Sequence, residues 1–497
     1  MNLNVTDGLI IALFMGLTVV LGCMNTGVIK NINAFALGRR APSTFALACT
    51  IIATWASGSG FLITLNETYS DGWYYLIPSL CMCLSMFIIA IFITPKMHYF
   101  FGSTTVASIM SDIYGKKVRK ITALCGALGV AGSIAVQFKV CGNIGHAIFG
   151  LEKYYFIIGM GMVIIWYSVI GGIKSVIKTD ILQVLVFMVT LPFTAGMIIY
   201  AAKHNPAVIE ISSVDKFNLL HVFTTYDDRI IDAILLGLYF AIPSLNPAAI
   251  QRISMGESIS RAKKAWLYAG LALIVIELFS AVVPYYIYQI NPSLKEGEIL
   301  GYIINNFTVS GFRGLLLVGI IAMAMSTADS YLNISAVLIA NDLWKADTLS
   351  NESKLYNARR CAVFIGFAAI VLACYNNSLL KIILWTNSFY MPIVTVPLLF
   401  GIYEYRTSEK NVLISMGLTF LFVSSCHIAN FLNLFKTIDP IIPGMILNAV
   451  ILLSVGRFLK KEEDLTGGEI IEYEPKPTVR KHTKAKKKTK GLKKARS

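Results

Sequence analysis

The sequence has few charged residues: only 14% of its 497 positions are Asp, Glu, Lys or Arg, whereas 56% are hydrophobic. One or two soluble cores cannot hide that much apolar surface, so the composition excludes an ordinary soluble protein and favours a chain that spans a bilayer. The features of an enzyme are also scarce. The six histidines are scattered, and no phosphate-binding loop or nucleophile–base pair occurs at a useful spacing, so we expect no enzymatic activity.

Two further absences concern cysteine spacing and the N-terminus. The nine cysteines lack the paired spacing of a metal site and mostly lie in apolar segments, which indicates small core residues and no disulfide framework. The first apolar segment, Leu9 to Gly22, lacks the preceding basic region and the following small-residue cleavage site of a signal peptide. We therefore expect it to remain in the protein as a first membrane span.

Long apolar runs are abundant. A span needs about 20 apolar residues to cross roughly 30 Å of hydrocarbon, and this criterion predicts about 13 spans. They start near Val5, Ser43, Tyr74, Ile121, Tyr154, Asp180, Ile230, Ala265, Gly314, Cys361, Leu379, Val412 and Pro440. The predicted fold is all-α and transmembrane, with a transmembrane domain over residues 1–460 and a disordered basic cytoplasmic tail over 461–497.

Basic residues are concentrated in one alternating set of loops, with clusters around Arg39, Lys117, Arg261 and Arg359. Such loops favour the cytoplasm, so an odd number of spans predicts a cell-membrane protein with its N-terminus outside and its C-terminus inside. The net charge of +15 comes mostly from the tail beyond Pro475, so it does not indicate a nucleic-acid partner. We expect that tail to be solvated or attracted to anionic membrane lipid.

Two apolar segments are interrupted at their middle. The second contains Ser57-Gly58-Ser59-Gly60, and the seventh contains Pro243 and Pro247. Close helix packing through small residues, or a simple proline kink, explains either break alone. However, the breaks are five spans apart, as expected for inverted repeats that each open with a broken helix. Together they predict a binding site near the membrane midplane.

The ninth span has a polar stripe. Ser326, Asp329, Ser330 and Asn333 recur at intervals of three or four residues, so they share one helix face. Hydroxyls alone could bond to their own helix, but a carboxylate at that depth is costly and normally faces the protein interior. Unwound carbonyls and hydroxyls together suit Na⁺, so the second-span break and the Ser326-Thr327 pair form a candidate Na⁺ site.

Four motifs in order resemble the solute:sodium symporter family, and the resemblance extends from Phe35 to about Tyr405. The motifs are Phe35-Ala36-Leu37-Gly38-Arg39-Arg40, the stretch from Tyr167 to Gln183 with its double glycine and Thr179-Asp180, Gln251-Arg252, and Met325 to Ser330. The resemblance implies a LeuT-like 5+5 inverted-repeat fold, with core repeats at about 43–200 and 230–405. It also implies Na⁺-driven uptake, by alternating access, of a small organic solute such as an amino acid, pantothenate or a related carboxylate or amine. Within the family, the pattern is nearest the branch that carries amino acids, pantothenate or choline.

The resemblance also implies cation ligands. The main Na⁺ site would use the backbone carbonyls of Thr54, Ser57 and Met323 with the hydroxyls of Ser326 and Thr327. A second cation, which some members bind, would use Asp180, Ser326, Asp329 and Ser330. Asp329 replaces the serine of those members, which could tighten cation binding or serve a proton instead. Taken alone, Asp180 is interpreted as a helix N-terminal carboxylate at the cytoplasmic start of the sixth span.

The solute is less well defined by sequence. The candidate cavity-lining residues are Ser59, Phe61, Gln137, Tyr239, Ser244 and Asn246, although helix packing explains each of them singly. Pro243 stands where proline-transporting members have an aromatic residue, and Phe61 stands where sugar-transporting members have a polar one, which argues against both solutes. Two alternatives stay open: a proton-coupled symporter, and a membrane-embedded solute sensor with a separate signalling partner, which would bind solute without accumulating it.

Overall fold

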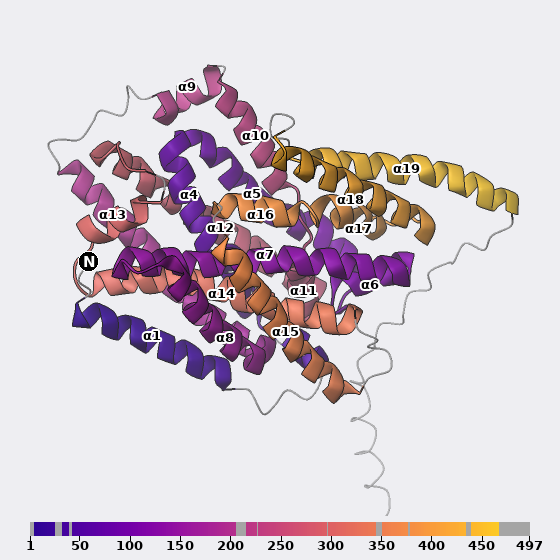
Figure 1. Ribbon diagram of the computed structural model, residues 1–497, viewed down its shortest axis with the longest axis horizontal. Coiled ribbons are helices and arrows are strands. Elements are labelled where there is room, and N and C mark those ends of the chain that lie inside the picture. The colour runs from indigo at the N-terminus through magenta and orange to yellow at the C-terminus, as the bar shows by residue number, and fades with distance from the viewer. Residues whose placement is uncertain are drawn as a thin grey trace, which may run out of the picture.

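A computed structural model describes residues 4–24, 32–38, 42–204, 215–225, 227–295, 297–343, 350–375, 378–433 and 439–466. The regular structure of these residues is helical throughout, with no strand among them, which confirms the predicted all-α class. Figure 1 shows the helices gathered in one bundle, with α14 (Phe312–Asp342) running through its middle.

The first helix, α1 (Val5–Cys23), lies at the edge of the bundle against α8 (Lys153–Lys203) and α14 (Figure 1). Its buried Asp7 accepts a hydrogen bond from the backbone N–H of Gly311, at 2.7 Å, just before α14 begins. A carboxylate is stabilised at a helix N-terminus because the macrodipole is positive there. This contact fixes α1 to the central helix.

The first half of the transport core contains the predicted break in the second span. Helix α3 (Thr44–Trp55) ends there and α4 (Gly58–Asp71) begins, with the Ser57 side chain capping α4 by accepting from the N–H of Gly60. The remaining elements of this half, apart from α8, are η2 (Gly72–Tyr75), α5 (Leu76–Ile88), η3 (Ile89–Ile93), η4 (Thr94–His98), α6 (Val106–Tyr114) and α7 (Lys116–Phe149).

Helix α8 contains the fifth and sixth spans. It bends at Gly172, whose φ of 60° lies in the region that favours glycine. Asp180 lies further along, in the middle of the same helix, and its side chain is buried in the protein. The predicted helix start at Asp180 is therefore wrong: a Thr-Asp pair is typical of a helix start, but here the double glycine makes the turn.

The second half of the core opens with the other predicted break. Helix α10 (Asp228–Ala241) ends before Pro243, and α11 (Pro247–Met255) begins after it, with the Asn246 side chain as its cap. Proline fits the first turn of a helix because no donor is lost there. The later elements of this half are α12 (Ile259–Ile290), α13 (Ile299–Asn306), α14, α15 (Asn351–Cys374), α16 (Leu379–Asn387), η8 (Met391–Thr395) and α17 (Val396–Ile402).

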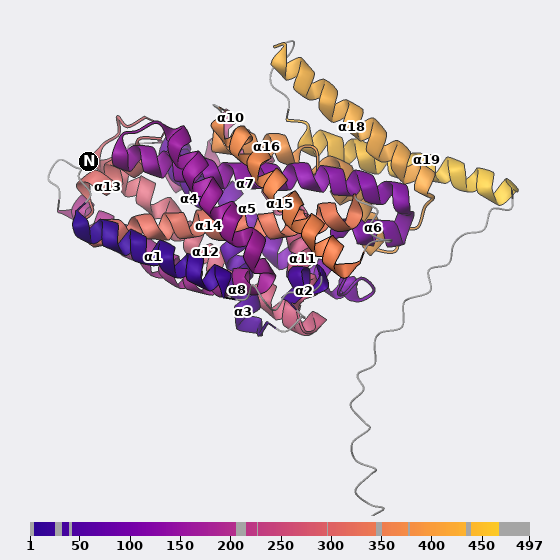
Figure 2. The same ribbon diagram turned by 60° about the horizontal axis from the view of Figure 1, so that its bottom comes forward.

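The last two helices, α18 (Glu409–Phe431) and α19 (Ile441–Thr466), pack against each other and extend beyond the rest of the bundle (Figure 2). Helix α19 continues past residue 461, where the predicted tail begins. The rest of that tail, residues 467–497, lies outside the described residues. A short helix, α2 (Ile32–Leu37), precedes α3.

Nine helical segments in the described part of the chain are long and apolar enough to cross a membrane. The count is lower than the number of predicted spans because Lys153–Lys203 contains two spans, and Gly58–His98 joins half of one span to the next. The halves of broken spans, such as Thr44–Trp55, are too short to count alone, and so is the apolar part of the last span, Ile441–Val455. Each predicted span nevertheless coincides with a helix or a broken helix.

Helix α14 is the most enclosed of these segments, because 94% of the residues in its most apolar stretch are buried. It contacts α1, α3, α4, α7, α8 and α15. A helix buried on all sides must find partners for its polar side chains within the protein. The polar stripe of the ninth span therefore lies at the centre of the molecule.

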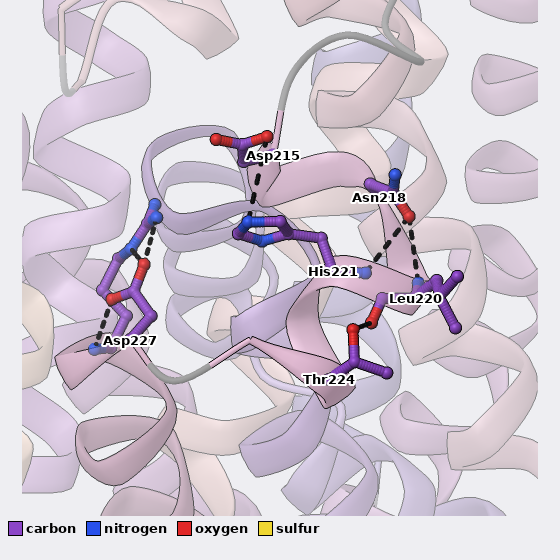
Figure 3. Close-up of polar contacts among 7 residues, drawn as sticks. Asp215, Asn218, Leu220, His221, Thr224 and Asp227 are labelled. Carbon is purple, nitrogen blue, oxygen red and sulfur yellow. Dashed lines mark hydrogen bonds and ion pairs between the residues drawn. The ribbon is translucent and has the colours of Figure 1, made fainter.

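A short segment before α10 lies over one end of the bundle and consists of η6 (Asp215–Phe217) and α9 (Leu219–Thr224) (Figure 1). Figure 3 shows its polar contacts: the Asn218 side chain caps α9 by accepting from the N–H groups of Leu220 and His221, at 3.0 and 3.2 Å. Asp227 follows the segment and accepts hydrogen bonds from the Arg229 guanidinium, which lower the pKa of Asp227 to about 2.

Lys216 connects this segment to the core. Its Nζ donates to the carbonyls of Tyr69 and Ser70, at 2.9 and 3.0 Å, near the end of α4. It also lies 4.0 Å from the ring centre of Tyr288 on α12. Burial lowers the pKa of Lys216, and a lysine at a helix C-terminus is placed favourably for the macrodipole.

Candidate solute and cation sites

The end of α3 faces α14 across the second-span break. Carbonyls in the last turn of a helix have no N–H donor within that helix. Here the hydroxyl groups of α14 donate to the last carbonyls of α3. Ser326 Oγ donates to the Ala53 carbonyl at 2.9 Å, and Thr327 Oγ1 lies 3.2 Å from that carbonyl and 3.4 Å from that of Thr54. Both hydroxyls also lie 3.0 Å from the Met323 carbonyl.

These oxygens form a cluster that we call the neutral cluster: the carbonyls of Ala53, Thr54 and Met323 with the hydroxyls of Ser326 and Thr327. Two hydroxyl hydrogens cannot serve all three carbonyls at once, so acceptors outnumber donors. The last turn of α3 also presents the negative end of a helix dipole. A buried set of oxygens without a formal charge suits a hard monovalent cation such as Na⁺.

The neutral cluster contains four of the five residues predicted for the main Na⁺ site. The fifth, Ser57, forms no hydrogen bond with these groups among the described residues, and its carbonyl accepts the first hydrogen bond of α4, from Phe61 N–H at 3.0 Å. Its role as a ligand stays a prediction. Sequence reasoning missed the Ala53 carbonyl. A general rule could have indicated it: the last turn of any helix leaves several carbonyls without helical donors, and Ala53 belongs to that turn of α3.

Of the residues predicted for a second cation, Ser326 belongs to the neutral cluster, Asp329 and Ser330 lie further along α14, and Asp180 lies on α8. All of them are fully buried. Asp329 Oδ2 accepts from the Tyr167 hydroxyl at 3.1 Å, and Asp180 accepts from the Thr50 hydroxyl. The other oxygen of each carboxylate, Oδ1, is buried without a hydrogen-bond partner among the described residues. The structure thus gathers two carboxylates from α8 and α14 in one interior region.

Arg252 on α11 completes this region, which we call the charged cluster: Asp180, Asp329, Ser330 and Arg252. The guanidinium is fully buried and donates to Ser330 Oγ at 2.7 Å and to Thr54 Oγ1 at 3.1 Å. Sequence reasoning noted Arg252 only as part of a motif and gave it no site role. Its position on the helix that follows the second break could have indicated a role in the site. With both carboxylates ionised, the cluster carries one negative charge in excess.

A cavity of about 150 Å³ lies between the two broken helices, and we call it the main cavity. Five of the predicted lining residues are on its wall: Ser59, Gln137, Tyr239, Ser244 and Asn246. Phe61 is buried but does not line it. Thr54 and Thr327 of the neutral cluster line it as well, so the candidate cation site and the main cavity share a wall.

Hydrogen bonds hold the polar wall residues in place. Gln137 Nε2 donates to Ser59 Oγ at 2.8 Å, and Asn246 Nδ2 donates to the Tyr331 hydroxyl at 3.2 Å. Asn387 Nδ2 donates to the Tyr239 hydroxyl at 3.0 Å. Tyr331 and Asn387 also line the cavity and were missed from sequence, because a single polar residue in an apolar span carries no periodic signal.

Two broken helices at corresponding positions, a buried oxygen cluster at one break and a cavity between them define a secondary transporter with alternating access. The chain belongs to the sodium:solute symporter family, whose model matches residues 35–418. It is accordingly a multi-pass membrane protein that couples solute transport to Na⁺. The members of this family to which it is similar are transporters and not enzymes.

Three curated relatives illustrate the range of the family. The chain is 23% identical to the sodium/sialic acid symporter NanT of Aliivibrio fischeri, over 69% of this chain and 70% of that protein. It is 21% identical to the sodium/pantothenate symporter of Escherichia coli, over 86% and 90%. It is 22% identical to a sodium/proline symporter of Staphylococcus aureus, over 87% and 88%.

Solved structures confirm the LeuT-like fold. A Na⁺-coupled sialic acid symporter, solved in a substrate-bound outward-open state, matches with a TM-score of 0.77 at 16% identity, covering 93% of this chain and 98% of that one. A nucleobase-cation-symport-1 family transporter in a closed conformation matches with a TM-score of 0.55 at 11% identity, covering 86% and 94%.

Proposed function

We propose that the chain imports a small organic solute together with Na⁺ by alternating access, with Na⁺ held by the neutral cluster and the solute in the main cavity. The observation that carries the proposal is the contact between the α14 hydroxyls and the carbonyls at the end of α3, at 2.9 to 3.4 Å. Bound Na⁺ would supply the positive charge that this set of acceptors lacks. Ser326 and Thr327 would turn their oxygens toward it and their hydrogens away.

The shared wall supports coupling between the two ligands. Thr54 and Thr327 belong to the neutral cluster and also line the main cavity. When these residues reorient for the ion, the cavity wall changes with them. Ligands that stabilise the same arrangement of α3 and α14 bind with positive coupling, because each favours the state that the other needs.

Uptake of radiolabelled solute into proteoliposomes tests this proposal. The double change S326A/T327A removes two ligands at about 1.5 kcal/mol each or more, so apparent Na⁺ affinity should fall roughly 100-fold. Ser335→Ala is the matched control, because this buried serine of the same helix bonds only to its own helix, at Leu332. The Na⁺ assignment would be refuted if uptake is the same with and without Na⁺. It would also be refuted if the double variant takes up solute with the same Na⁺ dependence as the unmodified protein.

The size and chemistry of the main cavity support the proposed solute class. At about 150 Å³, with hydroxyl and amide groups on one wall, it suits a solute of few atoms such as an amino acid, or part of a larger carboxylate or amine such as pantothenate. Sialic acid, pantothenate and proline symporters among the relatives show that small organic solutes of several kinds fit this fold.

The proposed orientation has the N-terminus outside and the C-terminus in the cytoplasm, in the plasma or inner membrane. It is supported by the basic loops, and it places residues 215–225 over the outer ends of α4 and α12. Contact with membrane lipid is part of the same proposal, since the exposed side chains include Phe193, Phe364 and Val371.

The charged cluster supports a second candidate role. Its excess negative charge favours a second cation or a proton, which the Oδ1 atoms of Asp180 and Asp329 would accept, since neither has a partner in the described part of the chain. Arg252 already donates to Ser330, one of the predicted ligands, so a second Na⁺ would compete with the guanidinium. This favours a proton over a second Na⁺ as the additional coupled ion.

A further inference from the structure

Glu277 is a buried carboxylate that the proposed sites do not use. It lies on α12 and is 4% exposed. Its Oε2 accepts from the Thr64 hydroxyl of α4 at 3.0 Å, and the Ser79 hydroxyl of α5 also bonds to it. Both donors are neutral, and among the described residues no Lys, Arg or His forms an ion pair with Glu277. A carboxylate inside a span is costly without a positive charge beside it.

Glu277 also lines a cavity. Its pocket, of about 90 Å³, has mostly apolar walls that include the aromatic rings of Trp55, Tyr75 and Phe240. Several residues line this pocket and the main cavity alike: Trp55, Ser57, Met82, Phe240 and Ile383. The pocket is therefore a side chamber of the main cavity, and Glu277 stands at its end.

We propose that this side chamber binds a cationic nitrogen, an ammonium or quaternary ammonium group, carried by the transported solute. The carboxylate provides the opposite charge, and the aromatic faces attract a cation through their quadrupoles. Thr64 and Ser79 hold the carboxylate in one orientation. The inference rests on the proposed function, since it assumes that the main cavity is the solute site, and it narrows the solute class.

The walls of the chamber distinguish an organic cation from Na⁺. Na⁺ in such folds is held by several oxygens, as in the neutral cluster, whereas this chamber offers aromatic rings, Ile63, Pro78 and Met82 beside a few hydroxyls. An organic ammonium gains from both parts of this lining, because its alkyl groups pack against the apolar wall. The solute cation therefore fits better than a third ion site.

Thermal stabilisation of the purified full-length protein in Na⁺ buffer tests the inference with paired probes. Choline is compared with its uncharged carbon isostere dimethylbutanol, and ethanolamine with propanol. Each pair has nearly the same shape and differs by the positive charge. At least one charged member should stabilise the protein, with an affinity about 10- to 100-fold higher than that of its isostere. No stabilisation by either charged probe, or equal stabilisation by an isostere, overturns the inference.

A variant locates the effect. Glu277→Gln keeps the shape and removes the charge, and its amide can still bond to both hydroxyls, by accepting from one and donating to the other. It should weaken the charged probe about 10- to 100-fold and leave the isostere unchanged. Thr64→Val keeps the charge and should change the affinity about 5-fold or less. Equal effects of the two variants would mean that Glu277 has a packing role only, which contradicts the inference.

The failure of this inference can be told apart from the failure of the Na⁺ proposal. Stabilisation by Na⁺ alone reports on the neutral cluster and should be lost in S326A/T327A, with or without a solute probe. Glu277 contributes no oxygen to that cluster, so E277Q should respond to Na⁺ alone as the unmodified protein does. If E277Q instead loses the response to Na⁺ alone, Glu277 serves an inorganic ion and the solute-nitrogen inference is wrong.

Discussion

The neutral cluster and the charged cluster lie on the same helix, α14, and have opposite character. In the neutral cluster, carbonyls and hydroxyls approach one another without any formal charge. In the charged cluster, two carboxylates share the region with the Arg252 guanidinium. A site that must release its ion in every cycle benefits from neutral ligands, because binding stays weak enough to reverse. A site that contains its own cation holds its neighbours together at all stages.

The largest expected effect comes from removing that internal cation. Arg252→Gln removes the positive charge of the charged cluster, and leaving buried charge without compensation costs about 3–5 kcal/mol of stability. We expect a large loss of thermal stability of the purified protein. Arg261→Gln is the control, because that side chain is 52% exposed and its pairing with Glu257 should matter little.

The double variant R252Q/D329S tests the reason for this loss. Removing one carboxylate together with the guanidinium restores the balance of charge, so much of the lost stability should return. If R252Q is as stable as the unmodified protein, or if D329S does not rescue it, then the charged cluster is not held by its charges, and the contrast with the neutral cluster fails.

A smaller effect should separate the two hydroxyls of the neutral cluster. Ser326 lies behind the wall, whereas Thr327 lines the main cavity. Ser326→Ala should therefore lower apparent Na⁺ affinity about 10-fold, with solute affinity at saturating Na⁺ unchanged. Thr327→Ala should lower both. Initial rates of uptake over a matrix of Na⁺ and solute concentrations give both affinities, and identical behaviour of the variants would contradict the shared-wall account.

Asp329 tests what the charged cluster contributes to coupling. In D329S the excess negative charge is gone, and the remaining carboxylate, Asp180, is balanced by the Arg252 guanidinium. A transported proton is then no longer favoured there, so uptake should lose most of its dependence on external pH. Na⁺ affinity should change about 3-fold or less, since Asp329 contributes no oxygen to the neutral cluster. The measurement is Na⁺-driven uptake across a range of pH, beside S335A. If D329S keeps the pH profile of the unmodified chain, the charged cluster does not carry the proton.

The sequence was informative where polar residues recur at a helical period or where small residues and prolines interrupt a long apolar run. The two breaks and the pair Ser326 and Thr327 were predictable for that reason, and so was the all-α class. The Ala53 carbonyl was not, because the residue at which α3 ends depends on what faces it. Arg252 and Glu277 were missed because each is a single charge whose partners lie on other helices. Asp180 was misplaced because its local pattern outweighed the double glycine before it.

The smallest expected effect tests whether burial is what makes the charged cluster costly to alter. Lys216 also holds carbonyls and an aromatic ring, but it lies at one end of the bundle, where water competes. Lys216→Met should therefore cost only about 1 kcal/mol of stability, well below the loss for Arg252→Gln. Lys295→Met, an exposed lysine in the loop after α12, is the control. If K216M loses as much stability as R252Q, the contacts matter more than burial. Lys216 would then stabilise the packing of α4 and α12 as much as the guanidinium stabilises the interior.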